Sequence, residues 1–258
     1  MASPEERIRS HLLTSKSLPV SNAWLSNFFA STAQTQQRAP LTALTQTAVF
    51  RILVSNFTES LSTASPATLL PRDISDPAVQ ERRIPGPVPV QVLDIEDIGT
   101  SLWAQVEKIE QVERGETIRG REIVRSVNID GGDSENNTNN NRNNSNTTPS
   151  GNTVGHGPHR LILQDSMGNK AVAMELKDIP GISMDKISIG AKLVLKNTIV
   201  GRGMILMTPD TVTLLGGKIE AMDTLWKRTR KERLLEKIQN LEGEQPQNGA
   251  NNGDAMEE

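Results

Sequence analysis

The 258-residue chain contains no cysteine, no tyrosine and only three histidines. The absence of cysteine excludes a disulfide framework, a thiolate metal site and a cysteine nucleophile. His156 and His159 lie at the edge of an asparagine-rich stretch, and His11 stands apart from both, so neither a histidine base nor a metal site is expected. The sequence also lacks a phosphate-binding loop, a nucleophile elbow and a dinucleotide fingerprint. It therefore predicts a protein that is not an enzyme, with no metal, no cofactor and no small-molecule substrate.

Asp165 and Glu175 are the one pair of carboxylates that could act together as an acid and a base. Asp165 falls in a predicted hairpin turn and Glu175 at the end of a predicted strand. Carboxylates in such places more often cap turns or lie on the surface. This pair does not change the non-catalytic interpretation.

Long apolar runs are also missing. No stretch approaches the length needed to span a membrane, and residues 1–13 lack the apolar core of a secretory signal. We therefore expect a soluble intracellular protein without membrane contact.

Aromatic side chains make up only 3% of the chain, and their positions restrict the function. All four phenylalanines lie in the first 57 residues, and the only aromatic residue of the predicted barrel is Trp103. Residues 89–222 are also mildly acidic, with 14 Lys and Arg against 17 Asp and Glu. Domains that bind single strands tightly stack bases on aromatic side chains and follow the backbone with positive charge. A barrel that lacks both features is more consistent with protein binding.

Apolar residues recur at helical spacing through the first part of the chain, in Ile8 and Leu12, in Trp24 and Phe28, and over 41–57. We predict a three-helix bundle over residues 1–61. A stretch rich in Ser, Pro and Arg follows at 62–89, and we interpret it as an extended connector.

Short alternating runs separated by turn residues dominate the region from residue 90 to 217. We predict a first strand at Leu102–Ile109 and a hairpin around Asp165–Asn169, with further strands from Gly190 to Leu215. No crossover helix is long enough for a parallel unit, so this rhythm favours a small OB-type β-barrel. The fold class is thus α+β, a helical bundle followed by a barrel.

A long insert, predicted at residues 113–158, separates the first and second strands of this barrel. Its second part, 129–157, is an Asn/Gly/Ser tract that cannot bury enough apolar surface to order itself, and we interpret it as passive disorder. Its first part mixes arginines with apolar residues, and an ordered function and a passive loop are both open. The candidate residues in this part are Arg114, Ile118, Arg119, Arg121, Ile123, Val124 and Arg125.

Residues 218–241 are predicted to form a C-terminal helix, followed by a polar, disordered tail at 242–258. The helix carries a basic cluster that is most simply a solvated face, although it could contact DNA phosphates or act as a nuclear localisation signal. The candidate phosphate contacts are Lys227, Arg228, Arg230, Lys231 and Arg233.

The ordered motifs of residues 163–221 resemble the OB-fold of the RecQ-mediated genome instability protein 1 family. The resemblance is carried by L-x-D-x-x-G with a later Glu from Leu163 to Glu175, by G-x-K-L-x-L-x-N from Gly190, and by a third motif that begins at Gly203 and ends in L-G-G-x-I-x-A at Ala221. Parts of residues 20–109 are similar to the same family in the same order.

This resemblance implies a non-catalytic scaffold in the nucleus, in a complex of a RecQ helicase with topoisomerase III. Such a subunit binds the type IA topoisomerase and stimulates dissolution of double Holliday junctions, and it meets DNA junctions mainly through the complex. In the family, the insert between the first and second strands reaches the topoisomerase gate, which makes the residues named above gate-loop candidates. A second, C-terminal barrel is not found, so the chain is similar to the short, fungal-type form.

The barrel offers four candidates for the topoisomerase interface: Lys192, Lys196, Asp165 and Glu175. Lys192 falls on a lysine of the family pattern, and we expect Lys192→Glu to weaken topoisomerase binding while leaving thermal stability nearly unchanged. Two other hypotheses remain: an OB protein that binds single strands or junctions alone, and an adaptor for an unrelated partner.

Overall fold

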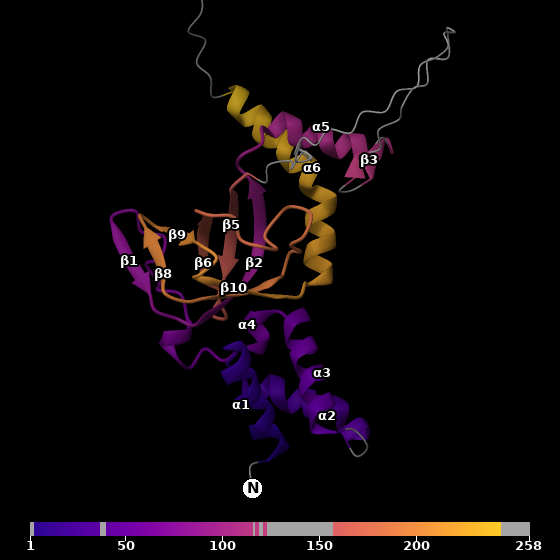
Figure 1. Ribbon diagram of the computed structural model, residues 1–258, viewed down its shortest axis with the longest axis vertical. Helices are drawn as coiled ribbons and strands as arrows, with labels where there is room; N and C mark the ends of the chain where they lie inside the picture. The colour runs from indigo at the N-terminus through magenta and orange to yellow at the C-terminus, as the bar shows by residue number, and fades with distance from the viewer. Residues whose placement is uncertain (1–2, 37–39, 116, 119–120, 123–156, 244–258) are drawn as a thin grey trace, which may run out of the picture.

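The computed structural model describes residues 3–36, 40–115, 117–118, 121–122 and 157–243. Figure 1 shows three parts stacked along the long axis: an N-terminal helical bundle, a curled β-sheet, and two helices, α5 and α6, that meet beyond the sheet. This arrangement confirms the predicted α+β class. No helix among the described residues has the length and apolar character needed to cross a membrane.

The bundle consists of α1 (Pro4–Lys16), α2 (Asn22–Gln36), α3 (Leu41–Val54) and the short α4 (Phe57–Ser60). Ser3 and Glu6 form a capping box at the start of α1, in which each side chain accepts a hydrogen bond from the backbone N–H of the other residue. The helices bury the apolar faces expected from the sequence around one core. Its fully or nearly fully buried members include Ile8, Leu12, Leu25, Phe28, Ala48, Ile52 and Phe57.

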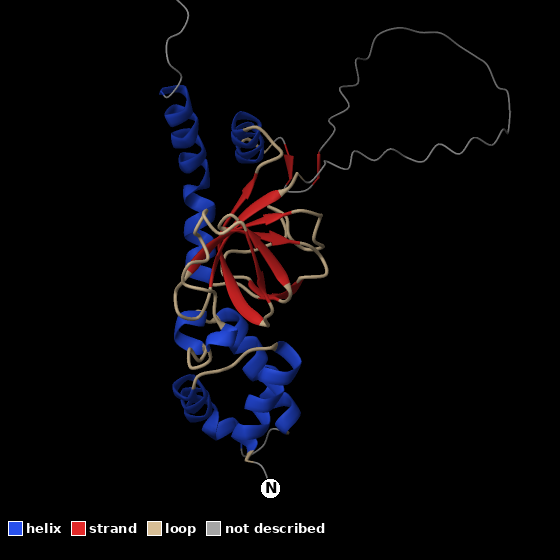
Figure 2. Ribbon diagram, turned by 90° about the vertical axis from the view of Figure 1, so that its left-hand side faces the viewer, coloured by secondary structure: helices blue, strands red, loops and turns tan. Residues whose placement is uncertain are grey.

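Eight strands form the curled sheet that Figure 2 shows above the bundle. They are β1 (Glu81–Ile84), β2 (Val88–Asp97), β5 (His159–Gln164), β6 (Lys170–Glu175), β7 (Lys192–Leu195), β8 (Thr198–Gly201), β9 (Met204–Met207) and β10 (Val212–Gly216). The order is β1-β8-β9-β6-β5-β2-β7-β10, and β6 with β9 is the parallel pair. The inward side chains of β2, β5, β6 and β7 build one apolar core inside the curl.

The prediction of a strand at Leu102–Ile109 is wrong, because these residues belong to α5 (Leu102–Glu113). The Ser101 side chain caps this helix by accepting a hydrogen bond from the backbone N–H of Ala104, at 3.2 Å. Leu102, Val106 and Ile109 recur at helical spacing and contact α6. Over so short a stretch, apolar residues can satisfy both the strand period and the helical period. The Ser101 cap decides in favour of the helix.

The first long strand of the barrel is instead β2, which begins inside the stretch interpreted as a connector. That stretch also contains β1 and a short 3-10 helix, η1 (Pro66–Thr68). β1 pairs with β8, and the Arg82 side chain forms an ion pair with Asp73. Much of residues 62–89 is therefore part of the sheet or held against it.

Since β2 ends at Asp97 and β5 begins at His159, the insert starts soon after residue 97 and includes α5. Its two ends meet: a Cβ on Gly99 would lie 2.6 Å from the Cα of Gly157, and the N–H of Ile98 donates to the carbonyl of Pro158 at 3.1 Å. Glycine is needed at this close approach because a side chain would push the two ends apart. After α5 come β3 (Thr117–Ile118) and β4 (Arg121–Glu122), which pair with each other. The Asn-rich tract, apart from Gly157, lies outside the described residues.

α6 (Glu220–Gly243) runs beside the barrel and continues past it to α5, as Figures 1 and 2 show. At its start, a carboxylate oxygen of Asp223 accepts a hydrogen bond from the N–H of Ile189, at 3.0 Å. Further along, Trp226 is buried against β2. The helix is thereby fixed on the barrel at its first two turns.

Candidate partner-binding surface

Lys192 does not lie on the surface, although we expected an exposed charge there. It is 0% exposed, and its ammonium group donates a hydrogen bond to Oε1 of Gln91 at 3.0 Å. The same group lies 4.5 Å from the centre of the Phe57 ring, so it links β7 and β2 to α4 of the bundle. Burial lowers the pKa of Lys192 to about 7. The lysine is a component of the joint between bundle and barrel.

Gln91 is the centre of this joint. Its Oε1 also accepts a hydrogen bond from the N–H of Phe57 at 3.0 Å. Its Nε2 donates to Oδ1 of Asn56 at 2.8 Å and to Oε1 of Gln164 at 3.0 Å. The first helical residue of α4 is thus hydrogen-bonded to the middle of the sheet, which gives the two parts a defined relative position.

Asp165 is also interior, with 0% of its surface exposed. One carboxylate oxygen accepts from the N–H groups of Met167 (3.0 Å) and Asn169 (2.9 Å), and the other accepts from the N–H of Leu70 at 2.9 Å. This residue closes the hairpin between β5 and β6 and attaches it to the segment that follows η1. A turn-capping role was the preferred reading of the sequence, and the geometry agrees with it.

Glu175 is 4% exposed and holds the far end of the same hairpin. Its Oε2 accepts from the backbone N–H of His159 at 3.0 Å and lies 2.5 Å from Nδ1 of the same residue. Its Oε1 accepts from the N–H of Ile179 at 3.3 Å. The carboxylate therefore joins the end of β6 to the start of β5, where the insert returns to the barrel. Its surface placement was predicted wrongly.

Of the four interface candidates, only Lys196 is exposed; it lies in the turn between β7 and β8. The structure does not bring the four together on one surface. Asp165 and Glu175 lie at opposite ends of the β5–β6 hairpin, and Lys192 is covered by Phe57 of the bundle.

Most of the basic cluster on α6 is paired with acceptors inside the chain. Lys227 pairs with Asp223 at 2.5 Å, Lys231 with Glu110 and Glu113 of α5 at 3.2 and 2.8 Å, and Arg233 with Asp94 of β2 at 3.2 Å. Arg230 donates to Oε1 of Gln105 at 3.4 Å. Arg228 is the member of the cluster that is exposed and has no ion pair within the described parts of the chain. The cluster is therefore less available to phosphates than its sequence indicates.

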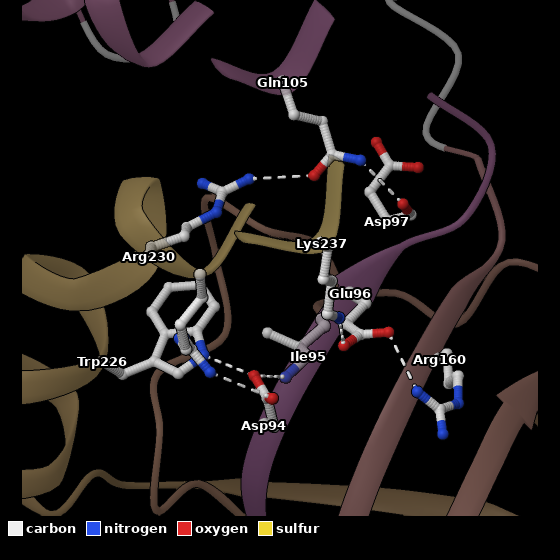
Figure 3. A network of polar contacts seen from close by, with 10 residues as sticks. Asp94, Ile95, Glu96, Asp97, Gln105, Arg160, Trp226, Arg230 and Lys237 are labelled. Carbon is white, nitrogen blue, oxygen red and sulfur yellow. Dashed lines mark hydrogen bonds and ion pairs between the residues drawn. The ribbon is translucent and has the colours of Figure 1, made fainter. Parts of the chain in front are cut away.

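Arg230 and Arg233, with their partners Gln105 and Asp94, line a groove of about 530 Å³ between β2, α5 and α6. Figure 3 shows Asp94, Glu96 and Asp97 along one side of it, with Arg230 and Lys237 opposite. The indole N–H of Trp226 donates to Asp94 at 2.5 Å.

Glu96 of the same groove pairs with Lys237 and with Arg160. Burial alone would raise the pKa of Glu96, but the hydrogen bonds and charges of Lys237 and Arg160 outweigh it and hold the pKa below its ordinary value. The charged side chains that line the groove are thus paired with one another, and these pairs attach α6 to the barrel.

The gate-loop candidates are only partly described. Arg114 directly follows α5 as its C-cap, is exposed and lies 3.7 Å from Glu110, while Ile118 lies in β3 and Arg121 in β4. Arg119, Ile123, Val124 and Arg125 lie outside the described residues. Among the described residues, no group of three or more His, Cys, Asp or Glu side chains could hold a metal ion.

Trp103, in the first turn of α5, is the feature that sequence analysis placed on the wrong element. Its side chain is 59% exposed, close to the point where the two ends of the insert meet. Ile98, at the same end of the insert, is also exposed. Exposed tryptophans are uncommon and are enriched at the energetic centres of protein interfaces. A signal was available in the sequence, because a strand assignment left this tryptophan without a place in the core.

Comparisons with known proteins agree with this architecture. Residues 70–230 match the family model described as RMI1, N-terminal OB-fold domain, and residues 12–60 match the one described as RMI1, N-terminal helical domain. The chain is 29% identical over 216 residues to RecQ-mediated genome instability protein 1 of Schizosaccharomyces pombe, which covers 82% of this chain and 87% of that protein. Helical bundle, OB-fold and sequence thus lead to one assignment: the chain belongs to the RecQ-mediated genome instability protein 1 family, whose members are OB-fold proteins of genome stability.

Proposed function

We propose that this chain is a non-catalytic subunit that binds topoisomerase III together with a RecQ-type helicase and stimulates dissolution of double Holliday junctions in the nucleus. The proposal is supported by family membership, which extends over both the bundle and the barrel, and by the name of the fission yeast relative, RecQ-mediated genome instability protein 1. In this complex the chain supplies contacts that position the topoisomerase, and the topoisomerase carries out the chemistry on the DNA strands.

The observation that carries the proposal is the exposed Trp103 beside the ends of the insert. A helix that shows a tryptophan to solvent at the start of a long insert is suited to protein contact rather than to nucleic acid stacking, since the described surface of the barrel offers no further aromatic platform. We propose Trp103 as an anchor for the topoisomerase, with the exposed Lys196 and Arg114 as additional contacts. DNA junctions are met mainly through the complex, and Arg228 is the member of the α6 basic cluster best placed to touch phosphate.

Binding between the purified proteins tests this assignment. We expect Trp103→Ala to weaken topoisomerase III binding by at least about tenfold, because a central interface tryptophan commonly contributes about 2 kcal/mol. Phe50→Ala is the matched control, since Phe50 is an aromatic side chain 66% exposed on the far side of the molecule, on α3. Equal affinity of Trp103→Ala and wild type would remove α5 from the interface, and no binding by the wild-type chain would refute the proposed function.

A salt-dependent gel shift with single-stranded and junction DNA separates this proposal from an OB protein that acts alone. We expect weak binding by the isolated chain, because the cations of α6 are already paired with carboxylates. Tight binding without topoisomerase, reduced by Arg228→Glu, would favour the autonomous DNA-binding protein.

A further inference from the structure

α5 is held to the rest of the molecule mainly at two places, near its start and along its later turns, with a long ion pair of 3.9 Å between the exposed side chains of Lys108 and Asp185 in between. Near its start, Nε2 of the buried Gln105 donates hydrogen bonds to the backbone carbonyls of Asp97 and Thr100, each at 2.9 Å. These bonds attach the first turn of the helix to the end of β2. The Gln105 side chain is buried, and its Oε1 also accepts a hydrogen bond from Arg230 of α6 at 3.4 Å.

The second contact joins the later turns of α5 to α6. A small apolar cluster lies between them, formed by Val106, Leu234 and Ile238 with the partly buried Leu102, Ile109 and Leu235. At its outer end, the ammonium group of Lys231 bridges Glu110 at 3.2 Å and Glu113 at 2.8 Å. Glu113 is the last residue of α5, so this ion pair acts on the end from which the chain continues to β3 and β4.

Lys231 is suited to this contact at any physiological pH. Hydrogen bonds to Glu113 and Glu110 raise its pKa, so the side chain remains positively charged. All three side chains are partly exposed to solvent. Exposed ion pairs are individually weak and are screened by salt. The end of α5 is therefore held by a contact that a partner or a change in ionic strength can shift.

We propose that Lys231, Glu110 and Glu113 form a clamp that sets the direction of α5 and thereby the direction in which the β3–β4 hairpin leaves the barrel. Lys231 is a positioning residue: it acts through α5 and not by touching a partner. When the clamp opens, α5 pivots about its attachment at Gln105, and the β3–β4 hairpin that follows it moves with the end of the helix. The C-terminal helix thus controls the presentation of the insert.

The conformational part of this proposal stands alone, while its effect on junction dissolution rests on the proposed function. Because the chain has no cysteine, spin labels can be placed at Val112→Cys on α5 and at Arg202→Cys on the barrel without background labelling. Both positions are exposed. Pulsed electron spin resonance then reports the distance distribution between the end of α5 and the barrel.

We expect a narrow distribution for the labelled parent chain and a broader one for Lys231→Glu, which places three carboxylates together. A triple variant, Lys231→Glu with Glu113→Lys and Glu110→Gln, restores a single ion pair and should restore the narrow distribution. Arg228→Glu is the matched control on the same helix and should leave the distribution unchanged. Lys231→Met should shift the ratio of docked to released helix by no more than about fivefold, because exposed ion pairs are individually weak.

A narrow distribution in Lys231→Glu, with an unchanged melting curve, would overturn the clamp. If the clamp opens as expected, stimulated dissolution should fall while topoisomerase binding is retained, and the triple variant should recover the stimulated dissolution. An open clamp with normal dissolution would support the conformational proposal and count against the proposed role of the insert. Failure of the clamp and failure of the proposed role of the insert therefore give different results.

Discussion

The ammonium group of Lys192 lies 4.5 Å from the centre of the Phe57 ring, and this contact joins the barrel to the helical bundle. The bundle covers the outer face of β7 at this point, so a side chain that alternation would place in solvent is enclosed. Hydrogen bonds from Lys192 and from the Phe57 N–H meet on the same Gln91 oxygen. The joint therefore depends on one buried cation and one buried amide.

The buried lysine makes stability depend on pH. Burial lowers the pKa of Lys192 from 10.5 to about 7 in the folded protein. Between these values the unfolded chain binds more protons, so the free energy of unfolding should rise as pH increases from about 7 to about 10.5, by up to about 1.4 kcal/mol per pH unit. Below about pH 7 the lysine is protonated in both states, and its contribution to the slope disappears.

Urea unfolding at pH 7 and pH 9 measures this effect. Lys192→Met keeps the length of the side chain and removes the charge, so it should be more stable than wild type at pH 7. It should not show the rise in the free energy of unfolding that we expect for wild type between pH 7 and pH 9. Lys196→Met, in the exposed turn that follows β7, should keep the wild-type slope. An identical slope in wild type and Lys192→Met would contradict the assignment.

Charge reversal of Lys192 should unfold or loosen the joint, contrary to the expectation from sequence alone. Lys192→Glu would bury a carboxylate beside the Gln91 carbonyl oxygen and the Phe57 ring, and we expect a loss of about 3 kcal/mol or more. Lys196→Glu, which reverses an exposed charge, should change stability by about 0.5 kcal/mol or less. Thermal melting of the two variants gives the comparison; equal melting temperatures would show that Lys192 reaches solvent.

Asp165 should be one of the more sensitive polar positions of the barrel. Asp165→Ala leaves the N–H groups of Leu70, Met167 and Asn169 without their acceptor. We expect a loss of about 2 kcal/mol, because the Leu70 N–H is buried and an unsatisfied buried donor costs about 1–3 kcal/mol, while the other two bonds are only partly buried. Asp210→Ala, at an exposed position before β10, is the control. Chemical denaturation checks the difference, and equal midpoints for the two variants would argue against a structural role for Asp165.

Sequence patterns predicted the helices and strands that bury one face and expose the other. The helices of the bundle have one apolar face, and the β5–β6 hairpin alternates between core and outside, so both were recognised. β7 could not be predicted in this way, because its burial depends on what covers it. It is buried on both faces because α4 lies over it, and no local sequence pattern at Lys192 indicates that contact.

α5 illustrates a different limit. Its Leu102, Ala104 and Val106 satisfy a strand period, while Leu102, Val106 and Ile109 satisfy a helical one. The choice is made by the Ser101 cap and by the apolar face that α6 offers from more than a hundred residues away. The position of Trp103, and with it the candidate surface, follows from that choice and could not be derived from the period alone.

The two parts of the insert should differ in function. Residues 129–157 are dominated by Asn, Gly and Ser, whereas 113–128 contain four of the insert's five arginines and the apolar Ile118, Ile123 and Val124. Lengthening a loop costs only about 0.6 kcal/mol per doubling, and the ends of this insert are fixed where Gly99 meets Gly157. Deletion of Asp130–Thr153 should therefore leave the melting temperature, topoisomerase binding and stimulated dissolution close to wild type.

Replacement of Gly115–Val127 by a Gly/Ser linker of equal length should give the opposite result. Topoisomerase binding should be largely retained, because α5 and Trp103 remain, but stimulated dissolution should fall, because the side chains proposed to reach the topoisomerase gate are gone. Measuring binding and dissolution on both variants separates the two roles. If the deletion within the Asn-rich tract abolishes stimulation and the linker replacement does not, the active part of the insert is the tract, and the gate-loop candidates are misassigned.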